Sequence, residues 1–405
     1  MIWARAVSIV NARVIAHEGV VADSVRFSTR ILGIGDTPRH GDVVFDAAGA
    51  VVLPGLINAH DHLELNHYGR LKGRERYDNA AEWIDDLRPR LSGDPAIRQS
   101  RAHPLGERLF IGALKNLLAG VTMVAHHNPF YAELRRTVPI RVVRRYGWAH
   151  SFELERQPAG ARGEPGGEVA ARWRATPADA PFMVHLAEGV DATASGELAR
   201  LEALGCLQPN TVLVHGVAID GTGWQRVARA GAGLVWCPAS NVFLFGRTPD
   251  VRCLLDRNGD GPRIALGTDS RITGSRDLLD ELRAARGAAA VTAEELFAMV
   301  TCNAAALLHQ PRAGRIAVGL PADLMMIAGD GPPLDVLLAS TRRDVRLVVV
   351  DGRPLVADED LLPVFEGRHA TPRPLRVDGA PKIAESGLVR RIAGCPIVEA
   401  GVSAA

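Results

Sequence analysis

Lysine, paired cysteines, long apolar runs and surplus charge are all scarce in this 405-residue chain. The 47 basic residues are balanced by 46 acidic ones, which leaves a formal net charge of +1. A protein that binds nucleic acid or an anionic membrane needs a surplus of positive charge. No uncharged apolar run reaches the roughly 18 residues that a bilayer span requires. The sequence therefore predicts neither a nucleic-acid partner nor a membrane partner.

The five cysteines are odd in number and show no C-x-x-C spacing. This pattern favours buried or idle thiols in a reducing compartment over disulfides or a cysteine metal site. The N-terminal residues lack the compact apolar stretch and small-residue cleavage site of a signal peptide. An apolar content of 47% and a charged content of 23% are ordinary for a globular chain. We therefore expect a globular protein of the cytoplasm.

Strand patterns fill residues 1–53, where short Val- and Ile-rich segments are broken by Gly, Pro or Asp. From residue 54 to 312, apolar strand segments alternate with helical patterns, as in a parallel sheet that is covered by helices. This repetition predicts a (β/α)₈ barrel. The strand candidates are residues 120–129, 139–151, 181–189, 211–216, 232–238 and 263–270, and the clearest helix candidates are residues 106–120, 197–205, 223–231 and 275–289.

Strand patterns return after residue 312, so the two chain ends can complete one small sheet. The predicted fold is α/β: a distorted TIM (β/α)₈ barrel over residues 54–312, and a small β-sandwich domain built from residues 1–53 and 313–365. Residues 366–405 are rich in Pro, Gly and Arg and form a C-terminal extension without a predicted element. The turn-rich residues 157–167 are interpreted as a loop, at the place where the fourth barrel unit is due.

Metal-type side chains stand at the carboxyl ends of several predicted strands. Side chains at positions i and i+2 of a strand face the same way, so His60 and His62 can bind one ion together. Strand ends of a parallel barrel meet at one mouth, where barrel enzymes place their sites. Neutral imidazoles with a carboxylate suit a borderline divalent metal. The predicted metal ligands are His60, His62, His185 and Asp269.

Each of these residues also has an ordinary structural explanation. The H-x-H pair alone could be two surface histidines, and a strand histidine such as His185 or His215 could be a satisfied core residue. Asp269 could cap the helix predicted at residues 275–289. The recurrence of metal-type side chains at four separate strand ends, in order along the chain, favours the metal site.

Five short motifs follow one another at the predicted strand ends: PGLINAHDHL, HLAE, VHG, WCPASN and GTDS. In this order they resemble the amidohydrolase superfamily, and within it the branch that holds cytosine and guanine deaminases and triazine hydrolases. The later segments TCNAAALLH and GRIAVGLPADLMMI resemble the end of the barrel and its return to the β-sandwich in that branch. The resemblance covers residues 1–355. It implies one catalytic Zn²⁺ or Fe²⁺, hydrolysis of a small and often heterocyclic substrate, and a homodimer.

The scarcity of lysine bears on the number of metal ions. Binuclear members of the superfamily bridge two ions with a carboxylated lysine before the histidine of strand 5, and no lysine lies between His127 and His185. Glu153 or Glu155 could bridge instead. The resemblance therefore favours a single ion, with Zn²⁺ preferred over Fe²⁺.

The mechanism that the resemblance implies begins with water on the cation. A divalent ion lowers the pKa of bound water from 15.7 towards about 7, and the resulting hydroxide would attack an sp² carbon of an amidine or amide. Asp269 would take the proton of the water. Glu188, three residues after His185, would protonate the leaving nitrogen. His215 would hydrogen-bond the nucleophile or the developing oxyanion.

Three residues are predicted to contact the substrate. Asn241 either orients the substrate or satisfies a loop backbone. His126 and His127 stand where relatives often carry Asp; one of them is expected to face the pocket, and we select His127. Arg70 either binds a carboxylate or carbonyl or forms a surface salt bridge. Relatives often carry Gln three residues after the second histidine, but Leu65 stands there, so this position offers no amide for purine or triazine recognition.

The predicted function is that of a metal-dependent hydrolase of a non-peptide carbon–nitrogen bond, most simply a deaminase of an aminated nitrogen heterocycle. The alternative is hydrolysis of a cyclic amide, as in imidazolonepropionase-like relatives, because Glu188 serves both reactions. A non-catalytic role in assembly would need none of these ligands and is disfavoured.

Overall fold

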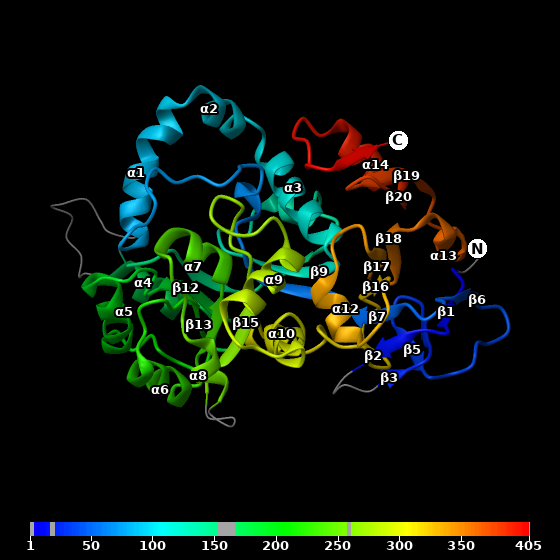
Figure 1. Cartoon of the computed structure of the whole chain (residues 1–405), viewed down its shortest axis with the longest axis horizontal. Coiled ribbons are helices and arrows are strands. Elements are labelled where there is room, and N and C mark those ends of the chain that lie inside the picture. The colour runs from blue at the N-terminus through cyan, green and yellow to red at the C-terminus, as the bar shows by residue number, and fades with distance from the viewer. Residues whose placement is uncertain (1–3, 17–20, 153–166, 257–260, 405) are drawn as a thin grey trace.

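The computed structural model of the chain has an α/β fold (Figure 1). It describes residues 4–16, 21–152, 167–256 and 261–404. Parallel strands and most helices come from the middle of the sequence, and strands from the two chain ends gather together beside them. In these ranges, no helix is both long enough and apolar enough to cross a membrane.

The first strands of the chain form a four-stranded sheet. In sheet order they are Ile31–Ile34 (β5), Val25–Phe27 (β4), Val7–Val10 (β1) and Val43–Asp46 (β6). β1 runs antiparallel to β4 and parallel to β6. Val7, Ile9 and Phe27 are fully buried on one face of this sheet, as the alternation of apolar residues in a half-buried strand predicts.

A nine-stranded sheet joins the two ends of the chain. In sheet order its strands are Val402–Ala404 (β21), Pro372–Val377 (β19), Ala380–Glu385 (β20), Arg353–Ala357 (β18), Val345–Val350 (β17), Leu324–Ile327 (β16), Val51–Pro54 (β7), Arg13–Ile15 (β2) and Val21–Ala22 (β3). The junction is β7, which pairs with β16 on one side and β2 on the other. The β17–β18 hairpin turns at Asp351-Gly352, both with positive φ. A Cβ on Gly352 would lie 1.8 Å from the carbonyl oxygen of Ser28, so the turn requires glycine.

Three strands of this sheet lie in the C-terminal residues for which the sequence predicted no element. In β19, Leu375 and Val377 are buried, whereas Pro374 and Arg376 are exposed. This period-two alternation is a strand signal. It is hidden in the sequence because proline and arginine occupy the outward positions.

Two parallel sheets occupy the middle of the chain. One has the order Arg141–Val142 (β10), Val121–His126 (β9) and Leu56–Asp61 (β8), and the other has the order Gly147–Ala149 (β11), Phe182–Leu186 (β12), Thr211–His215 (β13), Gly233–Trp236 (β14) and Arg263–Leu266 (β15). Every paired neighbour is parallel. The single strand predicted at residues 139–151 is wrong, because this segment divides into β10 and β11. The intervening Arg144 and Arg145 are exposed and cannot lie in a strand that is buried on both faces.

The helices come mostly from the part of the chain that supplies the parallel strands, and the last two contact the terminal sheets instead. They are Ala80–Gly93 (α1), Pro95–Arg101 (α2), Leu105–Leu118 (α3), Gly167–Ala175 (α4), Ala192–Ala203 (α5), Gly221–Arg229 (α6), Pro238–Phe245 (α7), Val251–Leu255 (α8), Leu278–Ala288 (α9), Ala293–Met299 (α10), Cys302–Leu307 (α11), Pro333–Ala339 (α12), Leu362–Gly367 (α13) and Ser386–Gly394 (α14), with 3₁₀ turns at Leu63–Leu65 (η2), Ala132–Arg135 (η3) and Glu359–Leu361 (η4). The four predicted helices coincide with α3, α5, α6 and α9. The predicted loop at residues 157–167 lies outside the described residues except for Gly167, which begins α4.

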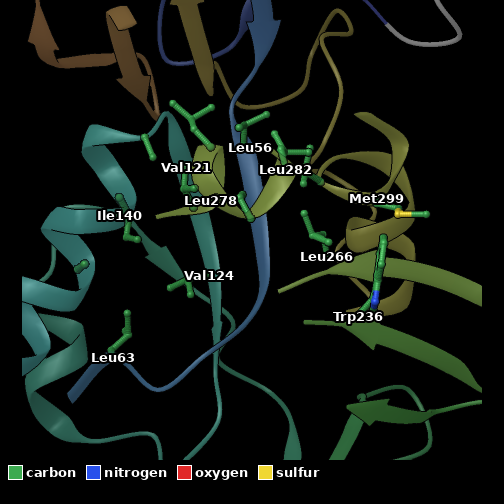
Figure 2. Packing of buried hydrophobic residues seen from close by; sticks show 14 of the residues in the cluster. Leu56, Leu63, Val121, Val124, Ile140, Trp236, Leu266, Leu278, Leu282 and Met299 are labelled. Atoms are coloured by element: carbon green, nitrogen blue, oxygen red, sulfur yellow. The ribbon is translucent and has the colours of Figure 1, made fainter. Parts of the chain in front are cut away.

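The apolar core fixes the ends of the parallel strands. Figure 2 shows Leu56 of β8, Val121 of β9 and Leu266 of β15 beside side chains from α9 and α10. Every residue of β8 and β9 is buried. Full burial of one such side chain contributes roughly 1.5–3 kcal/mol. Close packing of this kind holds the strands rigidly, and therefore also the polar residues at their carboxyl ends.

Candidate metal centre and active site

β8 ends in the segment His60-Asp61-His62, which brings two histidines to a common carboxylate. The Nε2 atom of His60 lies 3.8 Å from Oδ1 of Asp269, and the Nε2 atom of His62 lies 3.6 Å from the same oxygen. Both distances exceed that of a hydrogen bond. The spacing fits three ligand atoms arranged around one cation.

His185, at the end of β12, completes the predicted set. Its Nε2 atom lies 3.2 Å from Nε2 of His60. The ligand atoms of His60, His62 and Asp269 all lie within 4.8 Å of one another, as do those of His60, His185 and His215. Imidazole nitrogens with one carboxylate oxygen are a donor set that zinc accepts. The residues present therefore fit a bound divalent metal ion.

Backbone strain directs the chain at these strand ends. Ala187, His215 and Asp269 have φ values of 53°, 73° and 52°, in a region that costs a non-glycine residue of order 1–3 kcal/mol. Hydrogen bonds from backbone N–H groups hold two of these turns: Asp269 N donates to the backbone oxygen of His60 (3.1 Å), and Ala187 N donates to the side-chain carboxylate of Glu197 (2.6 Å). Such strain, stored at three neighbouring strand ends, is typical of a functional site.

Burial keeps the candidate ligand histidines neutral. It is the largest cause that lowers the pKa of His60 and of His185 well below the ordinary value, and neighbouring imidazoles lower both further. Burial also lowers the pKa of His62, to about 4, although Asp269 acts in the opposite direction. A neutral imidazole is the form that binds a metal ion.

Asp269 is held as a carboxylate. Burial would raise its pKa, but the electrostatic interaction with the His62 and His215 rings and the hydrogen bonds from Thr273 and Ser240 outweigh burial and lower it. Thr273 Oγ1 and Ser240 Oγ donate to Oδ2 at 2.7 and 2.9 Å. Oδ1 therefore remains the oxygen that faces the histidines. Asp269 does not cap a helix, because the N-cap of α9 is Asp277, whose side chain accepts from Leu279 N and Asp280 N.

Glu188 behaves in the opposite way. Burial raises its pKa to about 7, which suits a group that donates a proton near neutral pH. Oε1 of Glu188 lies 3.4 Å from Nε2 of His215. Nδ1 of His215 donates to Oδ1 of Asn241 (2.8 Å), which orients the ring so that Nε2 faces Glu188.

A buried ion pair holds Asp61, the residue between His60 and His62. The Lys115 ammonium lies 3.0 Å from the Asp61 carboxylate and donates to Asn66 Oδ1 (2.6 Å). Burial lowers the pKa of Lys115, although Asp61 raises it. Glu153 and Glu155, the alternative bridging carboxylates, lie outside the described residues.

The cluster opens into a cavity of about 490 Å³. Tyr68, Trp83, Leu87 and Ile272 give it apolar walls. Polar side chains also line it: His62, Glu64, Arg101, Arg108, Asn128, His150, His185, Glu188, His215, Asp269 and Ser270. Apolar walls with a few convergent polar groups are typical of a small-molecule site.

None of the three predicted substrate contacts lines this cavity. Asn241 is fully buried and supports His215. His127 stacks on His185 with ring centroids 4.4 Å apart, and its Nε2 atom bonds Ala149 O (2.9 Å). Arg70 is exposed, lies over the Phe243 ring and donates to Gly274 O.

Several cavity residues were not predicted from the sequence. Trp83, Ile84, Leu87 and Leu91 share one face of α1, and their helical spacing is a signal that could have found them. Glu64 lies two residues after His62 and accepts a hydrogen bond from Asn128. Burial raises its pKa to about 7.

Comparisons with known proteins identify the family of the chain. The Amidohydrolase family model matches residues 169–355. The 5-methylthioadenosine/S-adenosylhomocysteine deaminase of Halobacterium salinarum is 30% identical over 84% of this chain and 89% of its own length. The enzyme of the same name from Natronomonas pharaonis is 28% identical over 89% of this chain and 95% of its own. The chain belongs to the amidohydrolase family.

Solved structures share the fold. Atrazine chlorohydrolase from Arthrobacter aurescens TC1, complexed with zinc, superposes with a TM-score of 0.68 at 21% identity, over 87% of this chain and 96% of that one. An adenosine deaminase from Xanthomonas campestris with bound zinc gives 0.66 at 20% identity, over 90% and 97%. The family and the named deaminase relatives identify the protein as a hydrolase of carbon–nitrogen bonds, and metal-dependent deamination fits them.

Proposed function

We propose that this protein hydrolyses the amino group from an adenine nucleoside, with one zinc ion held by His60, His62, His185 and Asp269. The observation that carries the proposal is the convergence of these metal-type side chains beside the Glu188 carboxyl at the wall of one cavity. Two relatives named as deaminases of 5-methylthioadenosine and S-adenosylhomocysteine support the adenine nucleoside as the substrate class. Water is consumed, and ammonia and the 6-oxo nucleoside are released.

The roles follow from the two carboxyl groups. A divalent ion at these ligands supplies an activated water at neutral pH. Asp269 is ionised and can accept the proton of that water through Oδ1. Glu188, whose pKa lies near 7, can donate a proton to the substrate nitrogen. His215, oriented by Asn241, can hydrogen-bond the attacking water through Nε2.

A single ion is supported by the positions of the three lysines, all of which have other partners. Lys115 pairs with Asp61, Lys72 donates to Phe243 O, and Lys382 pairs with Asp358. None of them is therefore available as a bridging carbamate between two ions.

Two arginines support a substrate that carries an anion. Arg101 and Arg108 line the cavity, and Arg101 is exposed, which puts it at the mouth. Among the described residues, the buried Nε atom of Arg108 has no hydrogen-bond partner. A guanidinium suits a carboxylate, and S-adenosylhomocysteine has one where 5′-methylthioadenosine has only a methyl group. We therefore favour S-adenosylhomocysteine as the substrate.

We also propose that the two parallel sheets are parts of one distorted (β/α)₈ barrel over residues 54–312. The hydrogen bond from Asp269 N to His60 O links the end of β15 to β8, and that from His127 Nε2 to Ala149 O links β9 to β11. The shared nine-stranded sheet supports a composite β domain of residues 1–53 and 313–365, which the extension 366–405 continues.

Ammonia release tests the proposed function. Zinc-loaded protein is incubated separately with adenosine, 5′-methylthioadenosine and S-adenosylhomocysteine, and ammonia and product mass are measured. We expect one ammonia per 6-oxo nucleoside, and a kcat/KM about tenfold or more higher for S-adenosylhomocysteine than for 5′-methylthioadenosine, because a hydrogen bond to a charged group contributes roughly 1.5–3 kcal/mol.

The variant Arg108→Met tests whether Arg108 binds the carboxylate of S-adenosylhomocysteine. It should remove most of the preference for S-adenosylhomocysteine and leave turnover of 5′-methylthioadenosine nearly unchanged. A failure of all three nucleosides to release ammonia, or a ring-opened product, contradicts the proposed function. A preference that survives the substitution contradicts only the role of Arg108.

A further inference from the structure

The C-terminal residues 395–404, here named the C-terminal segment, carry one buried carboxylate. Glu399 is 3% exposed. Its two oxygens accept from both terminal nitrogens of Arg271 at 2.7 Å, and Oε1 also accepts from Arg342 at 2.6 Å. A bidentate pair with a guanidinium fixes both position and orientation. Glu399 therefore holds Arg271 in one defined place.

Arg271 lies two residues after Asp269, in the loop that joins β15 to α9 (residues 267–277, the β15–α9 loop). Its backbone N–H donates to Asn66 Oδ1 (3.1 Å). Asn66 in turn donates to Asp61 Oδ1 (2.7 Å), and Asp61 stands between the two β8 histidines. The C-terminal segment is thus connected through hydrogen bonds to both chain segments that supply the β8 and β15 metal ligands.

The β15–α9 loop builds part of the active site. Ser270 and Ile272 line the cavity, and Thr273 holds the Oδ2 atom of Asp269. The loop is tightly folded, since a Cβ on Gly274 would lie 1.9 Å from Thr268 O. A displacement of Arg271 would therefore move an oriented carboxylate and a substrate wall together.

Two arginines pair with Glu399, and the pairing matters more for Arg271 than for Arg342. Arg342 also has the Asp378 carboxylate, at 3.0 and 2.7 Å, and Ala400 O. Among the described residues, the other acceptors of the Arg271 side chain are the backbone carbonyls of Arg276 and Asn66. Neutralising Glu399 would thus leave Arg342 paired, and Arg271 would lose its bidentate partner.

We propose that Glu399 is a positioning residue, through which the C-terminal segment holds the β15–α9 loop in its catalytic geometry. The kinetic part of the test rests on the proposed function, whereas the exchange part does not. The C-terminal extension then helps to fix the geometry of the active site, in addition to adding strands to the β-sheet.

The test compares Glu399→Gln with Arg391→Gln. Arg391 lies in α14 and pairs with Glu107 of α3 at 2.7 and 2.9 Å, so its substitution removes a C-terminal ion pair that does not touch the loop. Amide hydrogen exchange is followed on peptides that cover residues 267–277. We expect exchange there to be about tenfold or more faster in Glu399→Gln, and unchanged in Arg391→Gln.

Kinetics give the second readout, with both variants assayed below their melting temperatures and their metal content measured. Glu399→Gln should lower kcat/KM on the order of 10–100-fold, with a raised KM, because small misplacements in a site are costly. Arg391→Gln should stay within about twofold of the wild type, since partly exposed ion pairs contribute little.

Arg271→Met removes the same ion pair by changing the partner in the loop. It provides the test if the Glu399 variant does not fold. The double variant Glu399→Gln/Arg271→Met should have a kcat/KM no lower than that of the single variant with the lower value. Unchanged exchange of the loop in Glu399→Gln or Arg271→Met overturns the inference, whether or not a nucleoside substrate is found. Faster exchange with unchanged kcat/KM overturns the catalytic importance of the loop geometry.

Discussion

At the residue scale, the pKa values of two buried carboxyl groups in one cavity are shifted in opposite directions. Burial acts on both. Hydrogen bonds from Ser240 and Thr273 and the neighbouring histidines keep Asp269 ionised, whereas burial raises the pKa of Glu188 to about 7. Pairs of titratable groups whose environments separate their pKa values identify the base and the acid of a hydrolytic site.

The substitution Glu188→Gln tests this division of roles. It keeps the shape of the side chain but removes the proton that the leaving nitrogen needs. We expect kcat to fall on the order of 10²–10⁴-fold, with metal content unchanged. Loss of the metal would mean that Glu188 is a ligand, and unchanged kcat would remove it from the mechanism.

The meeting of the candidate ligands could be predicted from the sequence, but the arginines that line the cavity could not. His60, His62, His185 and Asp269 stand at strand ends, and strand ends are marked locally by apolar runs and turns. Arg101 and Arg108 reach the cavity through the packing of two helices that follow β8. That arrangement is a long-range property with no local sequence mark.

At the element scale, one carboxylate joins three parts of the N-terminal sheet. Asp42, one residue before β6, accepts from Ser8 of β1 (2.8 Å), from Arg26 of β4 (2.7 and 2.9 Å) and from the backbone of Arg39 (2.9 Å). The Arg26 hydrogen bond is the largest cause that holds the pKa of Asp42 well below its ordinary value, against the effect of burial. The ionised form therefore stabilises the folded state.

This pairing predicts a pH-dependent contribution to stability. A carboxyl whose folded pKa is depressed stabilises fully above its unfolded pKa of about 3.9, and the contribution is lost as pH falls from there towards the folded value. Asp42→Asn should lower the free energy of unfolding by about 1.5–3 kcal/mol at pH 7. Urea unfolding of both proteins should give the same difference at pH 7 and 5, and a smaller one below about pH 4. A difference independent of pH would contradict the role of the charge.

The elements themselves were predicted where burial produces continuous apolar runs, as in β9, β12 and β13. The prediction of strands failed where apolar residues are interrupted by arginine or proline. The segment 139–151 contains two exposed arginines, and β19 alternates with proline and arginine. Their pairing partners decide the strands there, and pairing is not encoded in the segment itself.

At the scale of the whole molecule, two of the contacts between distant parts of the chain show what the sequence could and could not predict. The first strands and the last strands share one sheet through β7 and β16, which the sequence predicted in outline. Glu399 meets Arg271 beside the active site, which it did not predict, because a buried ion pair between residues 128 positions apart leaves no pattern in either segment.

The metal content of the purified protein tests the central claim most directly. We expect about one zinc or iron ion per chain after growth in metal-replete medium, and loss of that ion in the double variant His60→Ala/His62→Ala, measured by elemental analysis. Two ions per chain, a wild-type chain without metal, or a double variant that retains its ion would contradict the account.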